Sequence, residues 1–162
     1  MESVTVRPAS PTDVDDLVEL IGQLASYVRQ PDSCRITPEV LDAALFASHP
    51  AVFASVAEGD EGQVAGAAIW FLSFSTWEGR HGIFLEDLVV REECRGRGIG
   101  TALLGSLAAL CRERGYSRLE WSVLDWNENA IALYRSVGAR PIAGMTGYRL
   151  SGEALAAAAP SR

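Results

Sequence analysis

The sequence is poor in the residues from which metal centres and disulfide frameworks are built. Its 162 residues include three cysteines and two histidines. The cysteines, Cys34, Cys94 and Cys111, are odd in number and widely spaced, which matches neither a set of disulfides nor the ligand spacing of a zinc site. We therefore expect no metal, and a reducing compartment, the cytoplasm, is the simpler interpretation.

Basic residues and long apolar runs are also scarce. Fourteen lysines and arginines stand against 21 aspartates and glutamates, for a formal net charge of −7. Binding to a phosphate backbone needs a basic surface, so the balance argues against a nucleic-acid partner and leaves a cationic ligand open. No apolar run is long enough to span a bilayer, and residues 1–4 open no secretory leader. We expect a cytoplasmic protein with no membrane partner.

The length and the 48% hydrophobic content fit one globular domain. We place this domain at residues 1–152 and expect the alanine-rich tail, residues 153–162, to be a frayed helix or disordered. Hydrophobic periodicity predicts strands linked first by hairpins and later by helices, which favours an α/β (α+β) sheet with helices on both faces. The expected strands cover residues 4–7, 51–57, 63–74, 82–90, 118–124, 140–143 and 147–150.

A glycine-rich turn stands between an apolar strand and an amphipathic helix. Residues 95–100 read Arg-Gly-Arg-Gly-Ile-Gly. Glycines let the backbone approach a ligand closely, and a helix start offers unpaired N–H groups to an anion such as a pyrophosphate. Arg95 and Arg97 add charge and Thr101 adds a hydroxyl. The turn lacks the lysine of a P-loop and the spacing of a dinucleotide site, so the remaining alternative is a turn without a ligand.

The same turn resembles the acetyl-CoA signature of the GNAT N-acetyltransferases, Arg-x-x-Gly-x-Gly, with Arg95, Gly98 and Gly100 at its fixed positions. Residues 127–139 are similar to a second family block, Asn-x-x-Ala-x-x-x-Tyr-x-x-x-Gly, which supplies Asn127, Ala130 and Tyr134. Further likeness to the diamine acetyltransferase branch (spermidine/spermine and thialysine enzymes) covers about residues 3–150. It includes Arg7-Pro8-Ala9, Trp77, Leu85-Glu86-Asp87, Trp126-Asn127-Glu128 and Tyr148-Arg149-Leu150.

This resemblance implies a GNAT fold, with a central mixed, mostly antiparallel twisted sheet of six to seven strands. It also implies acetyl transfer from acetyl-CoA to a primary amine of a small molecule (a diamine, polyamine, thialysine or amino acid) by direct attack in a ternary complex. A homodimer is expected on the same ground. The residues that the resemblance assigns to acetyl-CoA are Leu88, Val89, Val90, Arg95, Gly96, Arg97, Gly98, Ile99, Gly100, Thr101, Asn127 and Ala130.

Two residues carry the implied chemistry. Tyr134 lies about two helical turns after Asn127 and, by resemblance, protonates the departing thiolate. Glu86, by resemblance, helps to remove the amine proton. Glu86 and Asp87 are neighbours on a strand, so their side chains should point to opposite faces unless a bulge intervenes. Burying such carboxylates is costly without a partner or a function.

The sequence motifs identify the amine substrate less closely than they identify acetyl-CoA. The residues expected to contact the amine are Tyr27, Trp77, Glu86, Asp87, Glu120 and Trp121. Polyamine enzymes of this branch place carboxylates at the positions of Val28 and Thr76, and Arg29 adds a positive charge here. A polycation therefore binds less well, which favours a smaller amine. The alternatives are a catalytically silent acetyl-CoA sensor and an acetyltransferase for protein lysines or N-termini.

Overall fold

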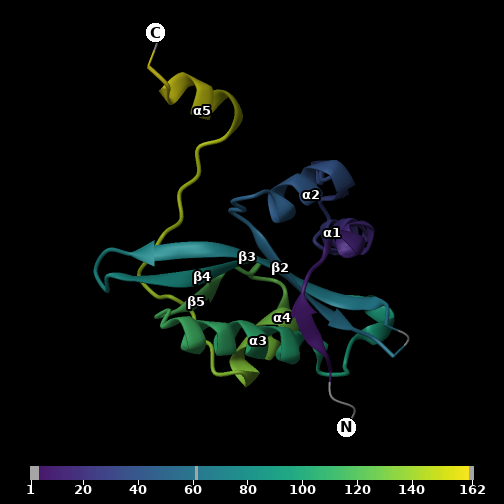
Figure 1. Ribbon diagram of the computed structural model, residues 1–162. Coiled ribbons are helices and arrows are strands. Elements are labelled where there is room, and N and C mark those ends of the chain that lie inside the picture. Colours follow the sequence, from purple (N-terminus) through teal and green to yellow (C-terminus); the bar gives the residue numbers. More distant parts are fainter. Residues whose placement is uncertain (1–3, 61, 161–162) are drawn as a thin grey trace.

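A computed structural model of the chain describes residues 4–60 and 62–160, and its centre is a five-stranded sheet (Figure 1). The strands lie side by side in sequence order. Neighbouring strands are antiparallel except for the last pair, which is parallel, so the expected mixed and mostly antiparallel sheet is confirmed. The strands are β1 (Val6–Pro8), β2 (Phe53–Glu58), β3 (Val64–Ser75), β4 (Arg80–Val90) and β5 (Leu119–Trp121).

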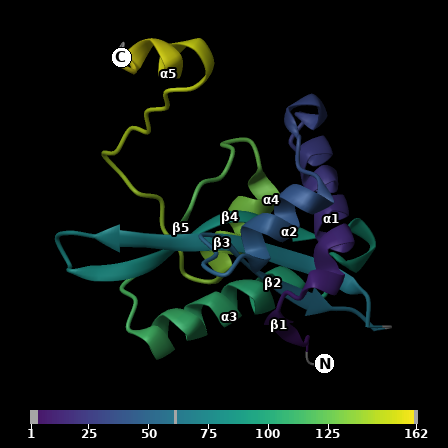
Figure 2. The ribbon, with the colours of Figure 1, turned by 45° about the horizontal axis from the view of Figure 1, so that its top comes forward.

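Helices cover both faces of this sheet, as the sequence predicts (Figures 1 and 2). Thr37 caps α2 (Pro38–Phe46) by accepting a hydrogen bond from the backbone N–H of Val40, and Gly115 ends α3 (Ile99–Arg114) in a left-handed conformation. Three short 3-10 turns, η1 (Pro11–Asp13), η2 (Pro31–Ser33) and η3 (Glu92–Cys94), join these elements. On one face lie α1 (Val14–Tyr27) and α2 (Pro38–Phe46), and on the other α3 (Ile99–Arg114) and α4 (Glu128–Ser136).

Each face of the sheet has its own apolar core. Leu17 and Leu20 of α1 are fully buried against strand residues such as Val56. Leu103 and Leu107 of α3 are buried on the opposite face. Burying one such leucine contributes about 1.5–3 kcal/mol, so both helices are held firmly against the sheet that carries the site.

The two C-terminal strands that we expected, at residues 140–143 and 147–150, are absent, which is why the sheet has five strands rather than six or seven. Pro141 has no N–H to donate, and a lone short hairpin with no face to bury is only marginally stable. The segment is extended and exposed, and Tyr148 is 96% exposed. It leads to α5 (Gly152–Ala158), which stands apart from the sheet in both views (Figures 1 and 2).

None of the helices within residues 4–60 and 62–160 has the length and apolar character needed to cross a membrane.

Candidate active site

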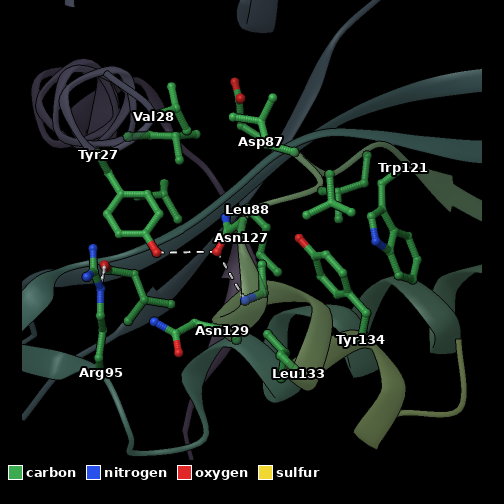
Figure 3. A pocket seen from close by; sticks show the side chains of 18 of the residues that line it. Tyr27, Val28, Asp87, Leu88, Arg95, Trp121, Asn127, Asn129, Leu133 and Tyr134 are labelled. Atoms are coloured by element: carbon green, nitrogen blue, oxygen red, sulfur yellow. Dashed lines mark hydrogen bonds between the residues drawn. The ribbon is translucent and has the colours of Figure 1, made fainter. Parts of the chain in front are cut away.

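A cleft of about 930 Å³ opens between the end of α1, the second half of β4, the glycine turn and α4 (Figure 3). Its origin lies in the sheet. β5 pairs with β4 only where Leu119–Trp121 faces Ile83–Leu85. Beyond that point the described residues give this edge of β4 no strand partner, so the backbone from Glu86 to Val90 forms one wall of the cleft.

A β-bulge at Glu86 shapes the floor. Asp87 pairs with Ile69 and Leu85 pairs with Trp70, so Glu86 is an additional residue in β4. The bulge resets the alternation of side chains, because Leu85 packs on the α3 face whereas Val89 packs on the α1 face. Glu86 and Asp87 consequently both line the cleft, and the simple alternation that would separate them does not apply.

The two carboxylates differ in environment. Glu86 is exposed in the cleft, whereas Asp87 is partly buried. Loss of water, followed by repulsion from the nearby Glu86, raises the pKa of Asp87 to about 6. No cation pairs with Asp87 among the residues that the structure describes. This carboxyl group therefore exchanges its proton close to neutral pH.

Tyr134 projects from α4 into the same cleft (Figure 3). Its ring lies 4.9 Å from the ring of Trp121, centroid to centroid, and this contact fixes its orientation. Burial raises the pKa of the Tyr134 hydroxyl above its ordinary value of 10. The hydroxyl thus stays protonated at neutral pH and is available as a proton donor.

The glycine turn forms a cradle for an anion. Gly96 and Gly98 have φ of 76° and 80°, which is left-handed backbone, and a Cβ at either position would meet open space within 4 Å. The first backbone bond within α3 runs from Ala102 N–H to the Gly98 carbonyl, so the N–H groups of residues 99–101 precede it. Together with the positive end of the helix dipole, they suit a pyrophosphate such as that of acetyl-CoA.

A polar bridge crosses the cleft near this cradle. The Tyr27 hydroxyl donates to Asn127 Oδ1 at 3.3 Å, and the same oxygen accepts the Ala130 N–H at 3.2 Å and so caps α4 (Figure 3). Arg95 donates from Nε to the Val90 carbonyl at 3.3 Å and places its guanidinium 5.2 Å from the centre of the Tyr27 ring. These contacts connect α1, β4 and α4 around the cleft.

Three residues that we assigned to ligands lie outside the cleft. Arg97 forms a 2.9 Å ion pair with Asp60, and Glu120 forms one of 2.9 Å with Arg118. Trp77 is 98% exposed in the turn between β3 and β4. The cleft brings together the other assigned residues: Tyr27, Glu86, Asp87, Leu88, Val89, Val90, Arg95, Gly96, Gly98, Ile99, Gly100, Thr101, Trp121, Asn127, Ala130 and Tyr134.

Several residues that line the cleft had no role predicted from the sequence. Leu133 packs where a Cβ on Gly100 would approach it to 3.0 Å, and its apolar side chain directly before Tyr134 in the helix block is the sequence signal for it. Val28 and Cys34 line the end of the cleft beside α1, and no pattern in the sequence points to Cys34. Within residues 4–60 and 62–160, no three side chains of His, Cys, Asp or Glu gather as metal ligands would.

Known proteins resemble this chain along nearly its whole length. The profile of the Acetyltransferase (GNAT) family matches residues 17–139. The thialysine N-epsilon-acetyltransferase of Bos taurus is 36% identical, with 96% of each chain covered. The L-ornithine N5-acetyltransferase of Arabidopsis thaliana is 37% identical over 58% of this chain and 41% of its own. An integron cassette protein from the mobile metagenome of V. cholerae superposes with a TM-score of 0.81 and 27% identity, covering 99% of this chain and all of that one. The chain therefore belongs to the acetyltransferase (GNAT) family, and it is an N-acetyltransferase.

Proposed function

We propose that the protein transfers the acetyl group of acetyl-CoA to the side-chain amine of a small amino acid, with both substrates bound at once. The observation that carries this proposal is that a single cleft contains a cradle for an anion, a pair of carboxylates and a protonated tyrosine. Acetyl-CoA is the donor used by GNAT acetyltransferases. The relatives named for thialysine and ornithine act on amino acids whose side chains end in a primary amine.

The residues present fit acetyl-CoA. The glycine turn would hold the pyrophosphate through the N–H groups at the start of α3. The unpaired edge at residues 88–90 of β4 would bond to the pantetheine arm as it would to a neighbouring strand. When bound, acetyl-CoA supplies an activated acetyl thioester to the cleft, and the residues around it provide orientation and proton transfer.

The carboxylates prepare the amine. An alkylamine carries a proton at neutral pH, so it must be attracted as a cation and then deprotonated before it attacks. Glu86 and Asp87 attract the ammonium group together. Asp87, with its pKa of about 6, is better matched to the working pH as a base than an ordinary carboxyl group. We thus extend to the pair the role that the family resemblance implies for Glu86, while Tyr134 donates a proton to the leaving thiolate.

We also propose a homodimer. The segment of residues 139–150 exposes Ile142, Met145, Tyr148 and Leu150, which are 57 to 96% accessible. β5 is an edge strand of the sheet, and an unpaired edge readily accepts another chain. A second copy of the chain would cover both features. Light scattering should give twice the 17.4 kDa mass, and a monomer at micromolar concentration would contradict this part of the proposal.

The test of the function is release of free thiol from acetyl-CoA with thialysine, ornithine, lysine, putrescine, spermine and a lysine peptide. We expect turnover with the free amino acids. Tyr134→Phe should lower kcat about 100-fold or more, with unchanged affinity for acetyl-CoA, because it removes the proton donor alone. Tight binding of acetyl-CoA without turnover on any amine would instead indicate a sensor, and preference for the peptide would indicate a protein acetyltransferase.

A further inference from the structure

Arg29 adopts a backbone conformation that its type disfavours. Its φ is 61°, and every other described residue with positive φ is a glycine. The conformation arises where α1 ends, because Arg29 N–H bonds to the Ser26 carbonyl and Gln30 N–H to the Ala25 carbonyl. Glycine is the usual residue at this position of a helix end. An arginine held there at a conformational cost points to a role for its side chain.

Arg29 stands next to the cleft in the chain. Its neighbours Val28 and Gln30 both line the cleft, as do residues on either side of Trp126 in the loop before α4. The Arg29 guanidinium lies 5.4 Å from the centre of the Trp126 ring. Trp126 is in turn 6.0 Å from the ring of Tyr27, centroid to centroid. Arg29 and Trp126 do not line the cleft themselves, but their contact holds Arg29 beside it, between α1 and the loop before α4.

The contact with Trp126 leaves the donors of Arg29 available. A cation–π contact of this kind uses the positive charge of the guanidinium and does not require its N–H donors. No carboxylate of the described residues forms an ion pair with Arg29. The fork of donors matches a carboxylate, which it can bind with two parallel hydrogen bonds.

Charges of both signs thus lie in and beside the cleft. Glu86, Asp87 and Arg95 line it, and Arg29 lies next to it, between the lining residues Val28 and Gln30. We infer that Arg29 determines specificity by binding the α-carboxylate of an amino-acid substrate whose side-chain amine reaches the carboxylate pair. A diamine or polyamine would bring a second cation to the same place without the carboxylate that neutralises the α-ammonium of an amino acid, and would be repelled. This inference rests on the proposed function, and it names the residue that favours amino acids over diamines and polyamines.

The experiment compares amines that differ only by the carboxylate: ornithine with putrescine, and lysine with cadaverine. The variant is Arg29→Gly, because glycine suits the left-handed conformation and should fold at least as well. Arg29→Lys retains the charge, and Arg35→Gln removes one equal charge from an exposed position farther along the same loop.

We expect the ratio of kcat/KM for ornithine over putrescine to fall about tenfold in Arg29→Gly, mainly through a higher KM for ornithine and a gain in turnover of putrescine. Arg29→Lys should keep part of the preference, and Arg35→Gln should keep all of it. If Arg29→Gly is active and its ratio of kcat/KM for ornithine over putrescine is unchanged, the inference is wrong. It is also wrong if the only change in this variant is a higher KM for acetyl-CoA. Absence of turnover by the unmodified protein with all four amines would overturn the proposed function itself.

Discussion

Two carboxylates shielded from water, Asp13 and Asp87, show how one chain uses the same side chain in opposite ways. Asp13 is 5% exposed and accepts two hydrogen bonds from Arg7, at 2.7 and 2.9 Å, as well as the Ser10 N–H at 2.7 Å. The guanidinium lowers the pKa of Asp13 to about 2. Asp87 has no such partner, and desolvation followed by Glu86 raises its pKa to about 6.

The two carboxylates differ in whether their charge stabilises or destabilises the folded state. The Asp13 charge is stabilised by its partners and joins β1 to the start of α1, so it strengthens the fold. The Asp87 charge is destabilised by its surroundings, which makes it a better proton acceptor and a weaker structural element. Substitutions at these two positions should therefore have opposite consequences for stability and for activity.

The largest expected effect is on the activity of Asp87→Asn. Asparagine keeps the shape of the side chain and removes both the charge and the base, so kcat/KM for the amine should fall about 100-fold or more. The measurement is steady-state thiol release at pH 7.5, compared with Asp42→Asn, which changes an exposed aspartate on α2. Activity within twofold of the unmodified protein would remove Asp87 from the mechanism.

The same Asp87→Asn variant should be more stable than the unmodified protein. A folded pKa above the unfolded value of 3.8 means that ionising Asp87 destabilises the native state. The shift to about 6 corresponds to a gain of ~2–3 kcal/mol for the variant at pH 7. Urea unfolding should show this gain at pH 7 and its disappearance as the pH falls from about 6 to below 3.8. Equal loss of stability and activity would mean that the substitution merely disrupts packing.

Asp13→Asn should do the reverse. It removes the charge that Arg7 stabilises, and the shift from 3.8 to about 2 corresponds to a loss of ~2 kcal/mol at neutral pH. Because this folded pKa is lowered, the loss should be complete above pH 3.8 and should vanish as the pH falls through about 2. Thiol release by the folded variant should remain within twofold, since Asp13 lies outside the cleft. Slower thiol release without a change in the free energy of unfolding would contradict a purely structural role for Asp13.

The smallest expected effect is the displacement of the pH profile by Glu86→Gln, which accompanies the weaker attraction of the ammonium group that loss of this charge should cause. The unmodified protein should lose kcat/KM as the pH falls through about 6, because Asp87 becomes protonated. Glu86 contributes to the raised pKa of Asp87, so removing its charge should move this acid limb to lower pH. The measurement is kcat/KM between pH 5 and 8 for both proteins. If the acid limb of the profile does not move in Glu86→Gln, a group other than Asp87 controls it.

The sequence predicted those parts of the molecule that are determined locally. The glycine turn occupies one run of residues before a helix, and its conformation follows from Gly96 and Gly98 themselves. The pairing that places both Glu86 and Asp87 in the cleft depends on the register between β3 and β4, which residues 82–90 do not reveal by themselves. Tyr134 was found because its helix block has a recognisable spacing, whereas Arg29 and Trp126 meet across nearly a hundred positions in sequence.

The C-terminal strands show a further limit. The alternation of residues 140–150 predicts strands, but among the described residues this segment pairs with no strand, although the outer edge of β5 is unpaired. Likewise Trp77 has the character of a pocket residue, but the long β3–β4 hairpin carries it out into solvent. Strand propensity shows that a segment can form a strand, but contacts with neighbouring elements determine whether it does.

The free edge of β4 has a thermodynamic consequence. A ligand that bonds to residues 88–90 in the native state, and not in the unfolded chain, shifts the folding equilibrium by mass action. At a concentration 100 times its Kd, it adds about 2.7 kcal/mol to the free energy of unfolding. Melting temperature should therefore rise with the logarithm of the acetyl-CoA concentration, and amides along β4 should exchange their hydrogens most slowly when the donor is bound. Bound acetyl-CoA would then also lower the fraction of unfolded chain that is open to proteolysis.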